Sequence, residues 1–177
     1  WCPDDKAEGW HREVGVGDMD KGHAGLLLLK AIITTVPGVP CIYQGDEYGV
    51  PGANDPDNRD MMSFEGYGDY EMKQYAATQA LLKERRQSMP LMYGDIRTLY
   101  ADDSVWVFAR NYMGDWAVVA INVRGEARLV EAQLPAFMEC GSFDVAVATE
   151  GAAAKCLGIG RHDSVKSCLV CQRNHLC

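Results

Sequence analysis

Apolar residues near the start of the chain repeat with the period of a helix. Between residues 20 and 35 they recur every three or four positions, at Ala24, Leu27, Leu28, Ala31 and Ile32. This spacing predicts a helix from Asp20 to Thr35, which Gly38 and Pro40 then end. A second helix is predicted from Asp69 to Gln87, with Asp69 as its N-cap.

A short apolar run follows the first predicted helix. Residues 39–43, "VPCIY", are bounded by proline and glycine, which is typical of a strand buried on both faces in a parallel sheet. The order of helix, tight turn and buried strand indicates an α/β unit. Ligands of such folds bind at the carboxyl ends of the strands, so residues 44–68 are predicted to lie on the functional face.

The pattern changes after Pro90, where short alternating runs are separated by turn residues. The runs are "IRTLY", "SVWVFARNY", "DWAVVAINV" and "ARLVEAQL". They predict antiparallel strands, because each run has the length and composition of a strand and is followed by a turn signal. The strand side chains expected to alternate into the core are Trp106, Phe108, Trp116 and Val118. The regular pattern fades after Glu139.

The loop after the first apolar run is rich in polar side chains that can recognise hydroxyl groups. Its carboxylates, amides and guanidinium belong to Asp46, Glu47, Asn54, Asp55, Asp57, Asn58 and Arg59. The planar fork of Arg59 could hold Asp57 by a bidentate contact. The alternative is that these Asn, Asp, Pro and Gly residues only form turns and bond their own backbone.

Composition narrows the classes of partner. The chain has 177 residues, 47% of them hydrophobic, and a net charge of -8, so it can support a core. Its 17 basic residues are scattered, which argues against nucleic acid, and no apolar stretch reaches the roughly 20 residues needed to cross a membrane. A neutral or polar ligand is favoured. The chain begins at Trp1 with no leader, and we expect a piece of a longer protein.

The order of residues in the loop resembles one enzyme family. "GVPCIYQGDEYG" followed by "NDPDNRDMM" is similar to the last barrel strand and following loop of α-amylase family glycoside hydrolases. "NDPDNR" is most like the version in neopullulanases, cyclomaltodextrinases and related maltodextrin-acting enzymes. "GWHREVGVGD", residues 9–18, resembles the segment that follows the third catalytic carboxylate of the family, and the resemblance continues to about residue 135.

The resemblance implies an α/β plus all-β fold. Residues 1–89 would be the C-terminal part of a (β/α)8 barrel, residues 90–139 a small antiparallel β-sandwich domain, and residues 140–177 a divergent Cys-containing tail. It also implies a fragment of a retaining enzyme that acts on α-glucans, with the complete parent protein active. The motifs that carry the three catalytic carboxylates of the family are absent here, so this chain alone is expected to be inactive.

The resemblance also suggests residues for sugar binding. Asp57 and Arg59 would contact an α-glucan near the catalytic subsites, while Tyr43 and Glu47 would form a supporting wall. No catalytic residue, metal ligand or cofactor is predicted for this chain, although the resemblance allows calcium in the complete enzyme. His11 and His23 have no neighbour in sequence that suggests activation of a nucleophile, and they are predicted to be structural or solvated.

The tail supports a second hypothesis of another class. Cys168, Cys171, His175 and Cys177 could chelate zinc by residue type, although their spacing is cramped for a structural zinc site. The chain would then be a noncatalytic β-rich binding or interaction module with a metal site. A divergent tail and sequence from a shifted reading frame are the other interpretations.

Overall fold

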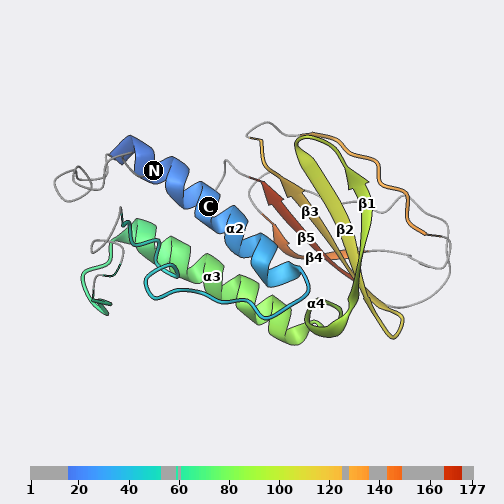
Figure 1. The fold of residues 1–177 in the computed structure, drawn as a ribbon, viewed down its shortest axis with the longest axis horizontal. Coiled ribbons are helices and arrows are strands. Elements are labelled where there is room, and N and C mark those ends of the chain that lie inside the picture. The colour runs from blue at the N-terminus through green and yellow to red at the C-terminus, as the bar shows by residue number, and fades with distance from the viewer. Residues whose placement is uncertain are drawn as a thin grey trace.

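The computed structural model contains two long helices beside a mixed β-sheet (Figure 1). It describes residues 16–52, 59, 61–124, 128–135, 143–148 and 166–172. The helices are α2 (Val16–Thr35), α3 (Asp69–Gln87) and the short α4 (Met89–Tyr93). Both predicted long helices are present, although α2 begins at Val16 and not at the predicted Asp20. Their apolar period and end signals are local properties of the sequence.

The start of α3 differs from the prediction by one position. Gly68 is the N-cap, and Asp69 is the first helical residue. The backbone N–H of Gly68 donates to Oε2 of Glu71 at 3.0 Å. Glu71 at the third helical position therefore pairs the backbone N–H of the N-cap residue, whereas Gly68 has no side chain that could accept from the N–H groups of the first turn.

The sheet has the strand order β1-β2-β3-β5-β4. Its strands are β1 (Asp95–Ala101), β2 (Val105–Tyr112), β3 (Asp115–Asn122), β4 (Phe143–Ala148) and β5 (Lys166–Gln172). The antiparallel prediction is confirmed for β1, β2 and β3. No strand was predicted where β4 and β5 lie, and β5 runs parallel to both β3 and β4. Long connections precede β4 and β5, and parallel pairing needs such crossovers of a dozen residues or more.

The fourth predicted strand, "ARLVEAQL", is absent from the sheet. Its described part, residues 128–134, has no regular secondary structure and is drawn in orange in Figure 1. Val130, Ala132 and Leu134 pack against a cluster of buried apolar residues on one face of the sheet. The described residues thus form one sheet with a covering segment, not the two stacked sheets expected for a β-sandwich.

The two faces of the sheet bury separate apolar clusters. Phe108 is fully buried against the helices, together with Leu27 from α2 and Leu81 from α3, and Trp106 packs on the same side. Trp116 and Val118 belong to the cluster on the opposite face. The four side chains were expected in one core, but the pairing of Phe108 with Val119 turns Val118 to the other face. The helices and the sheet thus share the apolar cluster around Phe108. The predicted domain boundaries stay predictions.

The predicted buried strand at residues 39–43 is wrong for this structure. The segment has no strand conformation, and the side chain of Val39 is 94% exposed. A strand is stabilised by hydrogen bonds to neighbouring strands, and no described strand lies beside this segment. Residues 36–52 instead return along the two helices towards the start of α3 (Figure 1).

Arg85 of α3 binds the C-terminal end of α2. Its Nη1 donates to the carbonyl oxygens of Thr34 at 2.7 Å and Val36 at 3.2 Å, and its Nη2 donates to the carbonyl of Gly38. The last carbonyls of a helix have no intrahelical partner and carry partial negative charge. Because α2 has no basic residue in its own last turn, this cap comes from another element.

Arg110 of β2 reaches the same helix end from the sheet. Its side chain is fully buried, and its Nη1 donates to the carbonyl of Thr35. Its Nε and Nη2 donate to the carbonyl of Gly94, at 3.1 and 2.7 Å. Burial lowers the pKa of Arg110, and the nearby charge of Arg85 lowers it further. Two guanidinium groups thus join α2 to α3 and to the sheet.

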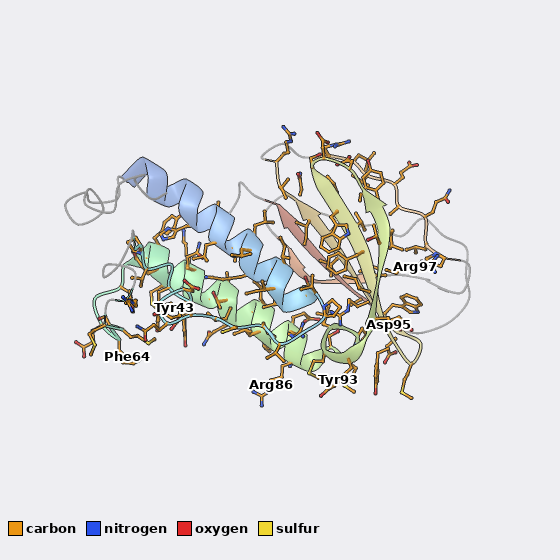
Figure 2. The ribbon with its side chains drawn as sticks, viewed as in Figure 1. Tyr43, Phe64, Arg86, Tyr93, Asp95 and Arg97 are labelled. Carbon is orange, nitrogen blue, oxygen red and sulfur yellow. The ribbon has the colours of Figure 1, made fainter. Side chains whose placement is uncertain are left out.

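Replacing Arg85 with Met is expected to lower the free energy of unfolding by about 2 to 4 kcal/mol, because three carbonyls lose a charged donor. Arg86 is the matched control, since it is the next residue of α3 and its side chain extends into solvent (Figure 2). Arg86→Met should change stability by less than about 0.5 kcal/mol. Urea unfolding measures both, and equal effects of the two variants would contradict the capping role.

Candidate functional site

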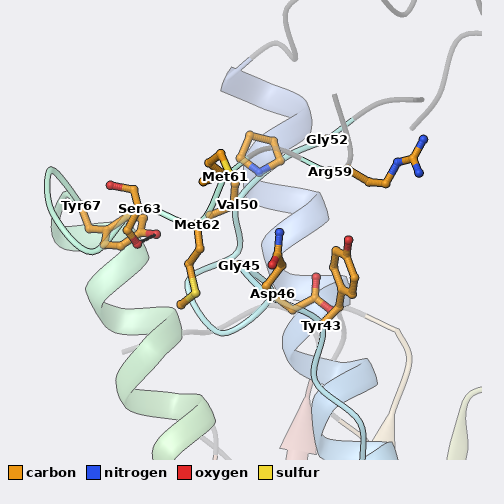
Figure 3. Close-up of a pocket in the computed structure, with 12 residues that line it drawn as sticks. Tyr43, Gly45, Asp46, Val50, Gly52, Arg59, Met61, Met62, Ser63 and Tyr67 are labelled. Carbon is orange, nitrogen blue, oxygen red and sulfur yellow. Dashed lines mark hydrogen bonds between the residues drawn. The ribbon is translucent and has the colours of Figure 1, made fainter. Parts of the chain in front are cut away.

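A pocket of about 550 Å³ lies beside the N-terminal part of α3 and is built mainly from the segment that follows α2 (Figure 3). The lining residues come from two stretches of the polar loop and from the residue before Gly68: Tyr43, Gln44, Gly45, Asp46, Val50, Pro51, Gly52, Arg59, Met61, Met62, Ser63 and Tyr67. Aromatic, apolar, amide and charged groups therefore meet in one open cavity.

The structure brings together two of the four predicted binding residues. Tyr43, 52% exposed, and Arg59 both line the pocket, together with the carboxylate of Asp46. In Figure 3 Tyr43 and Asp46 lie on one side, Tyr67 lies on the other, and the Arg59 side chain extends outward. Glu47 is not among the described lining residues. Asp57 lies outside the described residues, so its contact with Arg59 stays a prediction.

The pocket wall depends on a tight turn at residues 44–49. The backbone N–H groups of Tyr48 and Val50 both donate to the carbonyl of Gly45 at 3.1 Å. The N–H of Gly49 donates to the carbonyl of Asp46 at 3.1 Å. Gly49 has a φ of 76°, a left-handed conformation that other residues rarely adopt. This winding places Asp46 on the pocket side of the turn.

His23 of α2 anchors the end of this turn. Its Nε2 lies 2.7 Å from the carbonyl oxygen of Gly49, and a carbonyl can only accept, so Nε2 carries the proton. The buried imidazole stacks on Tyr70 with ring centroids 4.5 Å apart. Gln74 donates from Nε2 to the His23 carbonyl at 3.2 Å. His23 is therefore structural, which agrees with one of its two predicted roles.

Lys30 lies under the middle of the turn and is only 1% exposed. Its Nζ donates to Oε1 of Gln74 at 3.3 Å and to Oγ1 of Thr78 at 2.9 Å. The Thr78 hydroxyl also lies 3.3 Å from the Glu47 carbonyl oxygen. Burial lowers the pKa of Lys30 to about 8, although the charges of Asp46 and Glu47 act to raise it. Glu47 thus belongs to the support of the pocket and not to its lining.

Three stacked tyrosines support the other side of the turn. Tyr48 lies between Tyr67, with centroids 3.9 Å apart, and Tyr75 of α3, with centroids 4.7 Å apart. The rings are nearly parallel, with interplanar angles of 11° and 7°. Because Tyr67 also lines the pocket, the stack connects the cavity to α3.

Sequence reasoning missed Lys30 and Tyr67. A signal for Lys30 was present, because a lysine interrupts the apolar run "LLLLKAII" on a helix that buries apolar residues. Tyr67 gave no comparable signal, since it stands in a loop of glycine and other tyrosines. Its place in the pocket depends on the path of the chain between α2 and α3.

The described part of the chain contains neither a metal-ligand cluster nor a membrane-spanning helix. No three His, Cys, Asp or Glu residues gather there in a group that could hold a metal ion. Cys168 and Cys171 lie on β5, while His175 and Cys177 are outside the described residues. No helix among the described residues is long and apolar enough to span a membrane.

The chain is related to the α-amylase family of glycoside hydrolases, and it matches a short region of much larger proteins. It is 39% identical over 92 residues to a cyclomaltodextrinase from Thermoanaerobacter pseudethanolicus, covering 50% of this chain and 15% of that protein. It is 33% identical over 127 residues to an amylopullulanase from Thermoanaerobacter thermohydrosulfuricus, covering 65% of this chain and 8% of that protein. No family model matches the chain.

Solved structures show the same relationship. An α-amylase from Geobacillus thermoleovorans, complexed with acarbose, matches with a TM-score of 0.54 and 30% identity over 59% of this chain and 23% of its own. The γ-CGTase from alkalophilic Bacillus clarkii matches with a TM-score of 0.52 and 30% identity, over 59% of this chain and 15% of its own. The two helices and the antiparallel strands are thus an arrangement found in α-amylase-family proteins.

Gly49→Ala is expected to reduce the free energy of unfolding for two reasons. The left-handed backbone conformation costs alanine about 1 kcal/mol, and the new Cβ would also lie 2.7 Å from Cδ2 of His23, which adds to that loss. Gly66→Ala is the matched control, since Gly66 has a similar φ of 82° but open space around the new Cβ. Thermal unfolding of both variants separates strain from the clash. If Gly66→Ala destabilised the chain as much as Gly49→Ala, the contact with His23 would not be important.

Proposed function

We propose that this chain is the carboxy-terminal part of a glycoside hydrolase that acts on α-glucans of the maltodextrin type. The relatives that support this proposal carry the names cyclomaltodextrinase, amylopullulanase and neopullulanase, and one solved relative was complexed with acarbose. The observation that carries it is the pocket, because most of its lining comes from residues 43–62, which belong to the segment that carries the family resemblance. In this proposal residues 1–89 complete a (β/α)8 barrel.

The pocket has the chemistry to hold a sugar. Tyr43 offers an exposed aromatic ring, Asp46 offers carboxylate acceptors, and Arg59 offers guanidinium donors at the rim. Sugar rings present apolar C–H faces and many hydroxyls, so a site with one aromatic wall and charged hydrogen-bonding groups suits them. We assign Asp57 to the same wall as a partner of Arg59, and Glu47 to its support.

The chain by itself is proposed to bind glucan without cleaving it. Retaining hydrolysis needs a general acid and a nucleophile on two carboxyl groups about 5 Å apart. Among the described lining residues only Asp46 carries a carboxylate. In the complete enzyme the reacting carboxylates would come from other barrel strands, and this pocket would contribute one wall of the glucan site.

The binding proposal is tested by titrating the chain with maltoheptaose in a calorimeter. Tyr43→Ala should weaken binding about fivefold, which corresponds to the loss of about 1 kcal/mol of aromatic contact. The control is Tyr93→Ala, because Tyr93 is another exposed tyrosine that lies outside the pocket (Figure 2). Equal weakening by both substitutions would remove the pocket from the proposal.

We also expect no release of reducing sugar from starch, pullulan or cyclodextrin by the purified chain, because one carboxylate cannot serve as both acid and nucleophile. The same assay is run on a variant in which Glu47 and Asp57 are both replaced by amides. Activity from a contaminating enzyme would be equal in the two preparations. Activity in the parent chain that disappears in the double variant would show that the chain has its own catalytic pair.

A further inference from the structure

We infer that Lys30 is a positioning residue for the pocket: its buried ammonium group holds the turn at residues 44–49 in the shape that presents Asp46 to a ligand. This inference deepens the proposed function and rests on it for the identity of the ligand. The position of the turn itself can be measured without any ligand, so the two ideas can fail separately.

The geometry places Lys30 between the two long helices and the turn. Its stem belongs to α2, and its ammonium group bonds Gln74 and Thr78 on α3. The Thr78 hydroxyl donates to the carbonyl of Gln74 at 2.7 Å and lies 3.3 Å from the carbonyl oxygen of Glu47 in the turn, while the charges of Asp46 and Glu47 attract the Lys30 ammonium group directly. One buried group therefore connects three segments. Lys30 does not line the pocket and would not touch a ligand, so any effect on binding must pass through the turn.

The charged groups around Lys30 belong to the turn. Asp46 and Glu47 interact with its charge, whereas the groups it contacts on α3, Gln74 and Thr78, are neutral. Two other ionisable side chains lie at the turn: the imidazole of His23, which reaches it from α2, and the phenol of Tyr48, which belongs to the turn and stacks on Tyr75 of α3. Burial is the first cause that raises the pKa of Tyr48, so this phenol stays neutral near pH 8.

Protonation of Lys30 changes what holds the turn. As an ammonium ion it attracts both turn carboxylates, and as a neutral amine it keeps only hydrogen bonds to Gln74 and Thr78. Its folded pKa of about 8 brings this change into a range where the protein can be studied, because an exposed lysine titrates above 10. Ligand affinity should therefore fall as the pH rises through about 8.

The stability of the chain should change in the opposite direction. The pKa of Lys30 is lower in the folded chain than the usual 10.5, so between about pH 8 and 10.5 the unfolded state binds more protons. The contribution of this group to the free energy of unfolding then rises with pH across that window. A purely structural lysine would change stability alone, whereas a positioning residue would also lower affinity.

The test uses the full chain and three variants. Lys30→Met is neutral at every pH, Lys30→Arg stays charged at every pH, and Lys73→Met removes an exposed lysine of α3 as the control. The carbonyl ¹³C shifts of Gly45 and Gly49 report the turn, and calorimetry with maltoheptaose reports the pocket. Both are measured from about pH 6.5 to about pH 9.5, which spans the folded pKa of Lys30.

We expect the carbonyl shifts of the parent chain and of Lys73→Met to titrate with a midpoint near 8, while their affinity for maltoheptaose falls about fivefold or more. Lys30→Met should show no such titration and weak binding at every pH. Lys30→Arg should keep its affinity above pH 8, and it decides the question if Lys30→Met does not fold.

The failures of the two ideas are distinguishable. A carbonyl titration near pH 8 without maltoheptaose binding at any pH would support the role of Lys30 in the turn and contradict the proposed glucan function. Binding that is independent of pH in the parent chain, with no carbonyl titration, would overturn the inference and leave the glucan function standing. Parent-like binding by Lys30→Met above and below pH 8 would also overturn it.

Discussion

The C-terminal end of α2 lies inside the protein, so its last carbonyl groups must find donors that are not water. Arg85 and Arg110 supply these donors from α3 and from β2, and their long side chains allow both to reach the same helix end. Because each guanidinium needs several acceptors in a fixed arrangement, the helix end also fixes where α3 and the sheet can lie. The apolar side chains between the helices and the sheet then pack in one arrangement.

The same helix pair supports the pocket through a buried polar interface. His23 and Lys30 project from α2, Gln74 and Thr78 project from α3, and their hydrogen bonds end on the turn at residues 44–49. Polar groups in such an interface are costly unless each is bonded, which makes their positions specific. The support of the pocket is therefore a set of buried polar groups, while its lining includes exposed groups such as Tyr43.

Local signals predicted the elements that depend on local interactions. The helix that ends at Thr35, the helix from Asp69 to Gln87 and the three antiparallel strands follow from periodicity and turn residues. The strand expected at residues 39–43 did not form, since a strand needs partners that a local pattern cannot supply. The parallel pairing of β5 with β3 was also missed, because it joins segments far apart in the sequence.

The sequence alone determined the two helices, the meander of three strands, the polar loop and its likeness to α-amylase-family enzymes, because each is written in a continuous stretch of residues. Only the tertiary structure decided which side chains lose contact with water. Arg110 looks like an ordinary surface residue by type, yet it is fully buried. Tyr67 lines the same pocket as Tyr43 only because the chain between α2 and α3 brings the two residues together. Desolvation depends on all the segments that surround a group, and no local pattern contains that information.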